Sequence, residues 1–177
     1  MRILLLGGSK SGKSTAAQHL CRALGGEGPL YYWATMTPRD DEDRARIARH
    51  IADRDGWGFA TVERPRDLPG ALGEIDPAGC ILFDSVTAAL SERMFGAEFA
   101  ENAPDIVAEE LLTVSRHVRH FVAVCDDIFR GGETYEDWTE IYVRGLAAIA
   151  RRLAAEFDVV CEMSGGLPHL WKGEWPL

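Results

Sequence analysis

The sequence has few lysines, few cysteines and no long hydrophobic run. None of its apolar stretches approaches the roughly 20 residues that a membrane-spanning helix needs, and we therefore expect no membrane partner. The first residues run directly into a strand-like apolar segment and carry no secretion signal, which predicts a cytoplasmic protein. The chain shows no internal repeat, low-complexity tract or linker, so residues 1–177 are expected to form a single domain.

Cysteine occurs at only four positions, which are widely spaced and include no C-x-x-C pair. Three of the four lie in or beside apolar runs. We therefore interpret them as small core residues rather than as disulfide partners or metal ligands. The four are Cys21, Cys80, Cys125 and Cys161.

Positive charge is scarce as well. The formal net charge is −9, which argues against a nucleic acid as the main partner, because affinity for nucleic acids comes from neutralising phosphates. A nucleotide needs only a local positive site and is not excluded. His117 and His120 have the spacing of one helical turn, but no cysteine or carboxylate stands in register with them. A solvated helix end is therefore favoured over a metal site.

Two of the three lysines lie in one glycine-rich segment with the pattern G-x-x-x-x-G-K-S. An apolar run at residues 2–6 precedes the segment, and a helix-forming stretch at residues 15–24 follows it and ends at two glycines. A strand, this motif and a helix in succession are typical of a loop that holds the phosphates of a nucleoside triphosphate. The segment consists of Gly7, Gly8, Ser9, Lys10, Ser11, Gly12, Lys13 and Ser14.

Each residue type in this segment has a chemical role in phosphate binding. Glycines let backbone N–H groups close around a phosphate, and the N-terminus of the helix adds its dipole. Lys13 reaches the outer phosphates, while Ser14 offers a hydroxyl to Mg²⁺. The segment therefore predicts binding of a nucleoside triphosphate or a close relative.

Apolar runs alternate with helical stretches along the rest of the chain. The runs are nearly continuous, as in strands that are covered on both faces, and they predict an α/β protein with a phosphate-loop nucleotide-binding fold. In such a fold, helices flank a mainly parallel sheet, and ligands gather at the carboxyl ends of the strands. We expect strands at residues 2–6, 29–35, 80–84, 120–125 and 157–163, helices at 15–24, 40–53, 105–119 and 138–156, and the rim of the site at 7–14, 35–39, 84–87, 126–132 and 164–168.

Acidic residues follow two of these strands. Asp84 is placed like the second acidic partner of Mg²⁺ in phosphate-loop proteins; the alternative is a residue that caps a helix starting near Ser85. Asp126 and Asp127 end the fourth run. They could position a nucleophile, assist Mg²⁺ or act as a general base, or they could be turn residues, and the sequence does not decide between these roles.

The helix at residues 40–53 is heavily charged, and its charge pattern alone indicates a solvated helix. The spacing of three residues indicates a second, chemical role, since Arg46, His50 and Arg54 are four apart and so share one face. Guanidinium groups beside an imidazole disfavour a further positive charge on it, which leaves a ring nitrogen free to attack. A nucleophilic role for His50 is thus a second interpretation of this helix.

Several motifs together resemble the bifunctional adenosylcobinamide kinase / adenosylcobinamide-phosphate guanylyltransferase family of cobalamin biosynthesis. Their order and spacing follow the family along nearly the whole chain. The specific element is Arg46-Ile47-x-x-His50 after a phosphate loop, because many enzymes share phosphate loops alone. The matching segments are residues 7–14, 32–35, 46–54, 57, 61–65, 82–87, 164–168 and 172.

The resemblance implies roles for individual residues. His50 matches the histidine that takes GMP from GTP and passes it to the corrinoid phosphate, and Ser14 and Asp84 would hold Mg²⁺ beside a bound GTP or ATP. The acceptor would be a corrinoid, adenosylcobinamide, and the protein a homo-oligomer, usually a trimer in this family. Besides the phosphate loop, the positions that match nucleotide or metal contacts are Ala34, Thr35, Met36, Ile51, Ala52, Asp53, Arg54, Glu63 and Asp84.

Two stretches depart from the family pattern. The family usually has Asn-Glu-Val-Gly after the fourth strand, where this chain has residues 126–129. Asp127 keeps a carboxylate there, but Phe129 replaces a glycine at a rim where the backbone is expected to turn closely. The family's Asn-Gln pair falls near Ala150 and Arg151. We expect these positions to shape the corrinoid or kinase side of the site.

The main hypothesis is a Mg²⁺-dependent transferase that phosphorylates the aminopropanol hydroxyl of adenosylcobinamide and then transfers GMP to the product. One alternative is a phosphate-loop kinase of another small metabolite, in which His50 has no chemical role. The other is a non-catalytic nucleotide-binding module. These hypotheses differ in whether GMP labels the protein and in whether any substrate is turned over.

Overall fold

The computed structural model describes residues 1–38, 40–96, 100–132 and 135–177, except that the side chains of Arg46 and Asp53 lie outside the described part. The described chain forms a seven-stranded sheet with the strand order β3-β2-β4-β5-β1-β6-β7. All neighbouring strands are parallel except β6 and β7, which are antiparallel. The strands are β1 (Arg2–Gly7), β2 (Leu30–Ala34), β3 (Phe59–Glu63), β4 (Cys80–Asp84), β5 (His120–Asp126), β6 (Val159–Ser164) and β7 (Leu167–Lys172).

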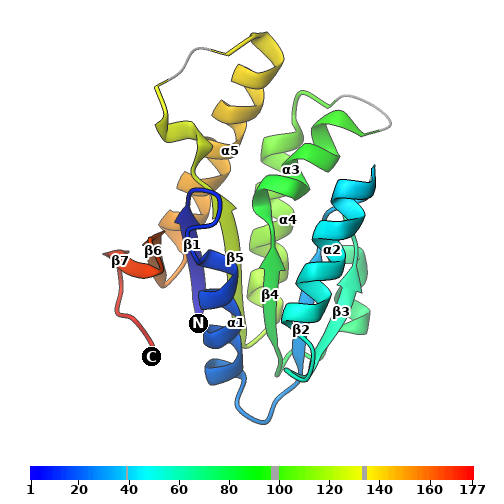
Figure 1. Ribbon diagram of the computed structural model, residues 1–177, viewed down its shortest axis with the longest axis vertical. Helices are drawn as coiled ribbons and strands as arrows, with labels where there is room; N and C mark the ends of the chain where they lie inside the picture. Colours follow the sequence, from blue (N-terminus) through cyan, green and yellow to red (C-terminus); the bar gives the residue numbers. More distant parts are fainter. Residues whose placement is uncertain (39, 97–99, 133–134) are drawn as a thin grey trace.

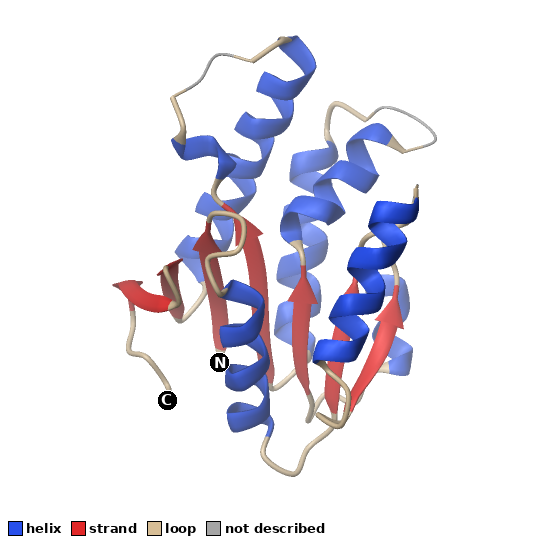
Figure 2. Ribbon diagram, in the orientation of Figure 1, coloured by secondary structure: helices blue, strands red, loops and turns tan. Residues whose placement is uncertain are grey.

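Helices cover both faces of the sheet (Figures 1 and 2). In this view α1 and α2 lie in front of the sheet, while α4 and α5 lie behind it, and α3 packs against both of these rear helices. The helices are α1 (Lys13–Gly25), α2 (Asp41–Asp53), α3 (Val86–Phe95), α4 (Ala103–His117) and α5 (Asp137–Glu156), with short 3₁₀ helices η1 (Leu68–Glu74) and η2 (Ile128–Arg130). The predicted α/β architecture with a mainly parallel sheet is confirmed.

The two faces of the sheet bury two separate apolar clusters, because successive side chains of a strand point to opposite faces. On β5, Phe121 and Ala123 belong to the cluster under α3, α4 and α5, while Val122 and Val124 belong to the cluster under α1. Both sets are buried. A central strand that is covered on both sides has no polar face, which is why the sequence shows continuous apolar runs there.

The observed elements also differ from the predicted ones. The structure adds β3 and β7, which the apolar runs did not predict, and it contains α3, which the sequence suggested only as a helix starting near Ser85. The helix expected at residues 105–119 ends at His117, because Val118 is extended, and His120 already belongs to β5. The two histidines therefore do not share a helix: His117 ends α4, His120 begins β5, and both side chains are partly exposed.

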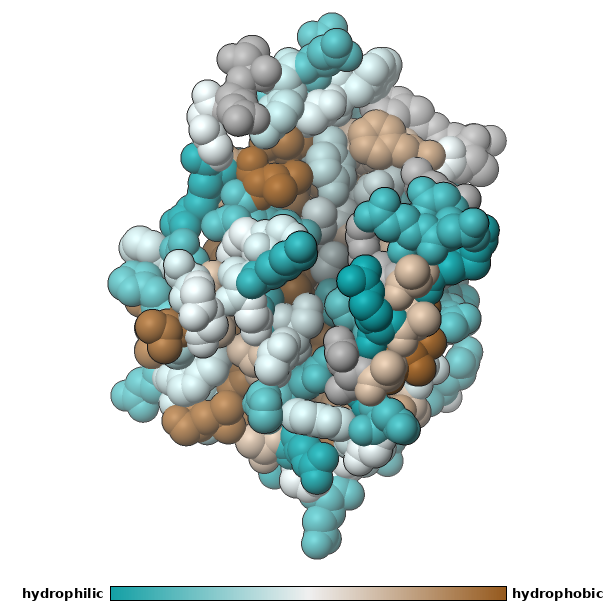
Figure 3. Space-filling view, in the orientation of Figure 1, coloured by the Kyte–Doolittle hydropathy of each residue, from teal (hydrophilic) through white to brown (hydrophobic). Residues whose placement is uncertain are grey.

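The cysteine prediction is confirmed, because all four cysteines are buried and free of disulfides. Among the described residues, no helix combines the length and the apolar character that a membrane crossing requires. On the surface, hydrophilic side chains gather over the first turns of α2, on the right of the space-filling view (Figure 3).

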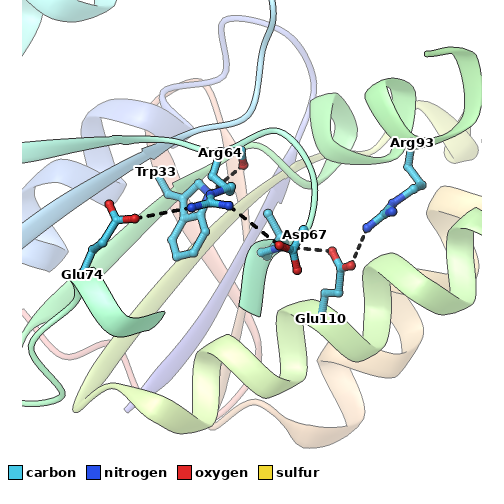
Figure 4. Close-up of polar contacts among 7 residues, drawn as sticks. Trp33, Arg64, Asp67, Glu74, Arg93 and Glu110 are labelled. Atoms are coloured by element: carbon cyan, nitrogen blue, oxygen red, sulfur yellow. Dashed lines mark hydrogen bonds and ion pairs between the residues drawn. The ribbon is translucent and has the colours of Figure 1, made fainter. Parts of the chain in front are cut away.

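Polar contacts tie β3 to the helices behind the sheet (Figure 4). Arg64 follows β3, accepts a hydrogen bond from the indole of Trp33 at its carbonyl, and pairs with Glu74 over 3.4 Å. Farther along, Glu110 on α4 pairs with Arg93 on α3 and accepts a hydrogen bond from the backbone N–H of Leu68. This network fixes the edge strand whose carboxyl end contributes Glu63 to the site described next.

Candidate functional site

The loop between β1 and α1 contains two glycines that other backbone segments approach closely. A Cβ atom at Gly7 would lie 2.5 Å from the carbonyl oxygen of Met163, and one at Gly12 would lie 3.1 Å from the Cα atom of Gly166. The N–H of Gly166 also donates to the carbonyl of Ser11 over 3.0 Å. The end of β6 and the turn that follows it therefore support the phosphate loop from one side.

Lys13 begins α1, and its side chain is almost fully buried beneath the loop. Its Nζ donates to the carbonyl oxygens of Gly7 and Gly8 over 2.8 and 2.7 Å and pairs with Asp126 Oδ1 at 3.0 Å. Gly12 occupies the N-cap position, so within the described chain no side chain caps the first N–H groups of α1. An ammonium group and an uncapped helix N-terminus in one loop suit a polyphosphate.

A cavity of about 490 Å³ lies beside this loop. His50 from α2 and Trp57 from the segment after it also line the cavity, so residues far apart in the sequence enclose the phosphate-binding side of the loop. The cavity is lined by Lys10, Ser11, Gly12, Lys13, Ser14, Thr15, Gln18, His50 and Trp57.

A second cavity, of about 320 Å³, lies at the carboxyl ends of β2, β3 and β4. His50 is half-buried and is the one residue of the described chain that lines both cavities. A group at this position can therefore reach a phosphate in the first cavity and a ligand in the second. The second cavity is lined by Tyr32, Ala34, Met36, Thr37, Pro38, Ile47, His50, Ile51, Arg54, Thr61, Glu63, Asp84, Ser85 and Ala88.

Arg54 and Tyr32 form a stacked pair in the second cavity. The guanidinium carbon of Arg54 lies 3.3 Å from the centroid of the Tyr32 ring, and the Arg54 side chain is buried. Its Nη1 is buried without a hydrogen-bond partner among the described residues, which is costly for a charged group unless a ligand supplies one. The cavity thus holds a cationic donor that is held flat against an aromatic ring.

Asp84 accepts a hydrogen bond from the Tyr32 hydroxyl over 3.0 Å. Burial raises the pKa of Asp84, and the nearby Asp126 raises it further, while His50, the Tyr32 hydroxyl and Arg54 oppose this change. Burial likewise raises the pKa of Tyr32, with Asp84 adding to the effect. These interactions place two carboxylates, a histidine and an arginine near one another at the strand ends.

The alternative role for Asp84 as a helix cap is wrong, because Ser85 caps α3. The Ser85 hydroxyl accepts a hydrogen bond from the N–H of Ala88 over 3.2 Å. Thr35, which directly follows β2, holds the same turn, since its hydroxyl donates to the Ser85 carbonyl over 3.0 Å and accepts from the Ser85 N–H over 2.9 Å. Thr35 is fully buried and lies behind the second cavity rather than on its wall.

Asp126 and Asp127 have different surroundings. Asp126 ends β5 and pairs with Lys13, whereas Asp127 precedes η2, and its N–H donates to the Gly7 carbonyl over 3.3 Å. Arg130 lies 3.6 Å from Asp127 and 2.5 Å from Glu162. The hydrogen bond from Arg130 lowers the pKa of the partly buried Glu162. These contacts attach the segment after β5 to both the phosphate loop and β6.

The structure brings most of the predicted site residues together, but not all of them. Ser9 and Ala52 are exposed and line neither cavity, and the side chain of Asp53 lies outside the described residues, as does that of Arg46. Gln18 was not predicted to belong to the site, yet it is buried against the loop cavity. The sequence pattern that could have identified Gln18 is its position as a polar residue on the apolar face of α1, beside Ala17 and Cys21.

Phe129 shows that the departure after β5 does not strain the backbone. It lies in η2, and it is not among the described residues with positive φ, so no glycine is required there. The backbone does turn closely here, in the 3₁₀ helix Ile128–Arg130, but the turn does not need a glycine. Phe129 instead packs against the core and, with Ala150 and Arg151, lines a separate hollow of about 500 Å³ beside α5.

The oxygen donors at the strand ends suit one kind of metal ion. Ser14, Asp84 and Asp126 present hydroxyl and carboxylate oxygens, which Mg²⁺ prefers. No group of three or more His, Cys, Asp or Glu side chains is placed to hold a metal anywhere in the described residues, His117 and His120 included. The donor set therefore fits an ion shared with nucleotide phosphates rather than a metal centre built from protein alone.

Comparison with known proteins finds a matching family model and similar proteins. The family model described as cobinamide kinase / cobinamide phosphate guanyltransferase matches residues 3–170. The bifunctional adenosylcobalamin biosynthesis protein CobU of Escherichia coli is 32% identical over 71% of this chain and 68% of its own. The corresponding protein CobP of Pseudomonas aeruginosa is 39% identical over 49% of each chain.

Two solved structures share the fold at low sequence identity. The flagellar accessory protein FlaH of Methanocaldococcus jannaschii has a TM-score of 0.53 at 13% identity and covers 98% of this chain and 78% of its own. A KaiC-like protein of Pyrococcus horikoshii has a TM-score of 0.51 at 17% identity, with 91% of this chain and 69% of its own covered. These similarities show the α/β fold alone.

Proposed function

Because the chain belongs to the cobinamide kinase / cobinamide phosphate guanyltransferase family, we propose that it carries out both reactions in that name. It would phosphorylate the hydroxyl of adenosylcobinamide with a nucleoside triphosphate, ATP or GTP. It would then transfer GMP from GTP to the new phosphate through a covalent intermediate on His50.

The observation that carries the proposal is the position of His50, which lines both the phosphate-loop cavity and the second cavity. A nucleophile that takes a nucleotidyl group from one substrate and gives it to another has to be reachable by both. The stacked Arg54 and Tyr32 favour the second cavity as a place for a charged or aromatic ligand group.

The proposed transfer takes place in two displacements. An imidazole nitrogen of His50 attacks the α-phosphorus of GTP, a P–N bond forms, and pyrophosphate leaves with the electrons of the broken P–O bond. A phosphate oxygen of adenosylcobinamide phosphate then attacks the same phosphorus, and the P–N bond breaks to restore the imidazole.

The other proposed residues stabilise charge. Lys13 and the N-terminal N–H groups of α1 neutralise the transferring phosphates, which is usually the main contribution in such reactions. A bound Mg²⁺ would neutralise them further, and Ser14 and Asp84 are the residues proposed to hold it. Glu63, Ala34, Met36 and Ile51 would contact the nucleotide from the walls of the second cavity.

The test is incubation with GTP labelled on its α-phosphate and Mg²⁺, without corrinoid. We expect acid-labile, base-stable label on the wild type and none on the His50→Ala variant. His169→Ala, an exposed histidine on β7, is the matched control and should keep the label. A folded, GTP-binding wild type that takes no label would contradict the transfer and leave a kinase of another metabolite or a nucleotide-binding module.

A further inference from the structure

The loop cavity, the one of about 490 Å³ beside the phosphate loop, extends past that loop along the first turns of α1. Lys13 and Ser14, which are expected to meet phosphate and metal, line one part of it. Gln18 lines it as well, four residues or about 6 Å farther along the helix axis than Ser14. Trp57, from the segment between α2 and β3, also contributes to the wall. The cavity therefore has room for more of a nucleotide than its phosphates.

Gln18 is a buried polar residue whose hydrogen-bonding groups are not used within the protein. It is only 6% exposed. Among the described residues its amide has no hydrogen-bond partner, yet the amide is not one of the polar groups sealed inside the protein, so it opens into the cavity. A buried amide without a partner costs free energy. Since the amide offers two N–H donors and one acceptor oxygen, a ligand whose edge both donates and accepts would satisfy it.

Trp57 stands between two glycines that have a left-handed backbone conformation. The φ angle is 74° at Gly56 and 80° at Gly58. A Cβ atom at either glycine would meet nothing within 4 Å. The path of the backbone, and not crowding, therefore requires the two glycines. That path places Trp57 at the wall of the loop cavity.

Contacts from α1 hold the ring of Trp57 in place. The ring of His19 forms a T-shaped contact with it, with 5.0 Å between the centroids, and the guanidinium carbon of Arg22 lies 5.4 Å from its centroid. Trp57 itself stays partly exposed. A partly exposed aromatic ring that is fixed beside a phosphate-binding loop is a platform on which a nucleobase can stack.

We propose that Gln18 and Trp57 form a base site for the phosphoryl donor, separate from the second cavity. The base stacks on the Trp57 ring and exchanges hydrogen bonds with the Gln18 amide, while the triphosphate lies in the phosphate loop. The guanine of the GTP that labels His50 lies in the second cavity instead. The inference rests on the proposed function, because it assigns one base site to each of the two reactions.

The two base sites differ in their chemistry. The second cavity presents charged groups, the guanidinium of Arg54 stacked on Tyr32 and the carboxylate of Glu63, which can distinguish one base from another. A stacking ring accepts any base, because every base has a π-face, and a glutamine amide can turn to present either its donors or its acceptor. The site of Gln18 and Trp57 therefore accommodates adenine and guanine alike.

The test compares a nucleotide with a ligand that has no base. Calorimetry with Mg²⁺ and without corrinoid measures the affinities for a non-hydrolysable ATP analogue and for inorganic tripolyphosphate. Trp57→Ala should weaken binding of the ATP analogue by about tenfold, or 1.4 kcal/mol, and change binding of tripolyphosphate by less than about threefold. Trp57→Phe keeps an aromatic ring and should keep most of the affinity. Trp138→Ala, which alters a largely exposed tryptophan on α5 that lines neither cavity, is the matched control.

Gln18→Leu tests the hydrogen bonds rather than the stacking. The variant keeps a side chain of similar size and replaces an amide that has no partner, so the fold should be retained. We expect the ATP analogue to bind about fivefold more weakly and tripolyphosphate to bind as in the wild type. Unchanged affinity for the ATP analogue would mean that the Gln18 amide does not meet the base.

The role of the site in phosphoryl transfer has its own measurement. In the phosphorylation of adenosylcobinamide, Trp57→Ala should raise the KM for ATP by about tenfold and leave kcat within about threefold of the wild type, as expected when uniform binding is lost. An unchanged KM would overturn the assignment of this site to the phosphoryl donor.

The outcomes separate the base site from the function. Equal losses for the ATP analogue and tripolyphosphate in Trp57→Ala would mean that the ring only supports the phosphate loop, and they would overturn the proposal. Unchanged affinity for both ligands would overturn it as well. If the wild type does not phosphorylate adenosylcobinamide, the proposed function fails; a loss confined to the ATP analogue would still support the base site, because the binding test needs no turnover.

Discussion

The Cβ atom that Gly12 lacks would lie 3.1 Å from the Cα atom of Gly166, so the phosphate loop and the β6–β7 turn meet backbone to backbone. Gly12 also has a φ of 96°, which L-residues with a side chain rarely adopt. The conformation of the loop that binds phosphate therefore depends on a hairpin more than 150 residues later in the sequence.

Gly12→Ala is expected to lower nucleotide affinity by at least about tenfold, or 1.4 kcal/mol, because the added methyl group separates the loop from the turn. Titration with a fluorescent GTP analogue measures this loss. Gly26→Ala is the control, since Gly26 also has positive φ but its Cβ would meet nothing within 4 Å. That variant should lose only stability, about 1 kcal/mol; equal nucleotide affinity in both variants would show that the contact is unimportant.

Arg54→Lys is expected to weaken nucleotide binding although the charge is kept. A planar guanidinium lies on the Tyr32 ring at 3.3 Å, and an ammonium group cannot stack in the same way or present the same donors. We expect a loss of about tenfold in affinity. Arg49→Lys on the exposed side of α2 is the matched control. Equal affinity of the Arg54 variant and the wild type would mean that Arg54 contributes only to the fold.

Central strands were predictable from the sequence, and edge strands were not. The strands β1, β4 and β5 are buried on both faces and appear as continuous apolar runs. The edge strands β3 and β7 have mostly exposed side chains, so no run marks them. The strand at β7 depends instead on pairing with β6 across two glycines, which a search for apolar runs does not detect.

The phosphate loop was equally predictable, because its chemistry depends on residues that are adjacent in sequence. Contacts between distant segments were not. Arg54 meets Tyr32 and Asp84 only because β2 lies between β3 and β4 in the sheet, and no pattern in the sequence fixes that order. The spacing of Arg46, His50 and Arg54 predicted a shared face, but Arg54 lies just beyond the end of α2, at its C-cap, and is buried.

Asp84→Asn is expected to stabilise the protein at neutral pH while activity is lost. Burial raises the pKa of Asp84, so the folded state binds this proton more tightly than the unfolded state does. The stability of the wild type therefore falls as pH rises from the ordinary aspartate value, about 4, through the raised pKa. The variant has no such proton to lose, so its advantage grows by up to about 1.4 kcal/mol for each pH unit across this window.

Thermal unfolding between pH 4 and 8, with a chelator present to remove divalent ions, measures this difference. The melting temperatures of the two proteins should be close at the acid end and separate as pH rises. Curves that stay parallel over the whole range would contradict the raised pKa of Asp84.

Glu110→Gln tests the network behind the edge strand, which Figure 4 shows. The side chains of Glu110 and Arg93 are only 16% and 21% exposed, so the variant leaves a charge partly buried without its partner. We expect a loss of about 2 kcal/mol in the free energy of unfolding, measured by urea denaturation. Glu156→Gln is the control, because its pair with Arg116 is about half exposed, and it should change stability by no more than about 0.5 kcal/mol. Equal losses in the two variants would mean that burial does not strengthen the Glu110 pair.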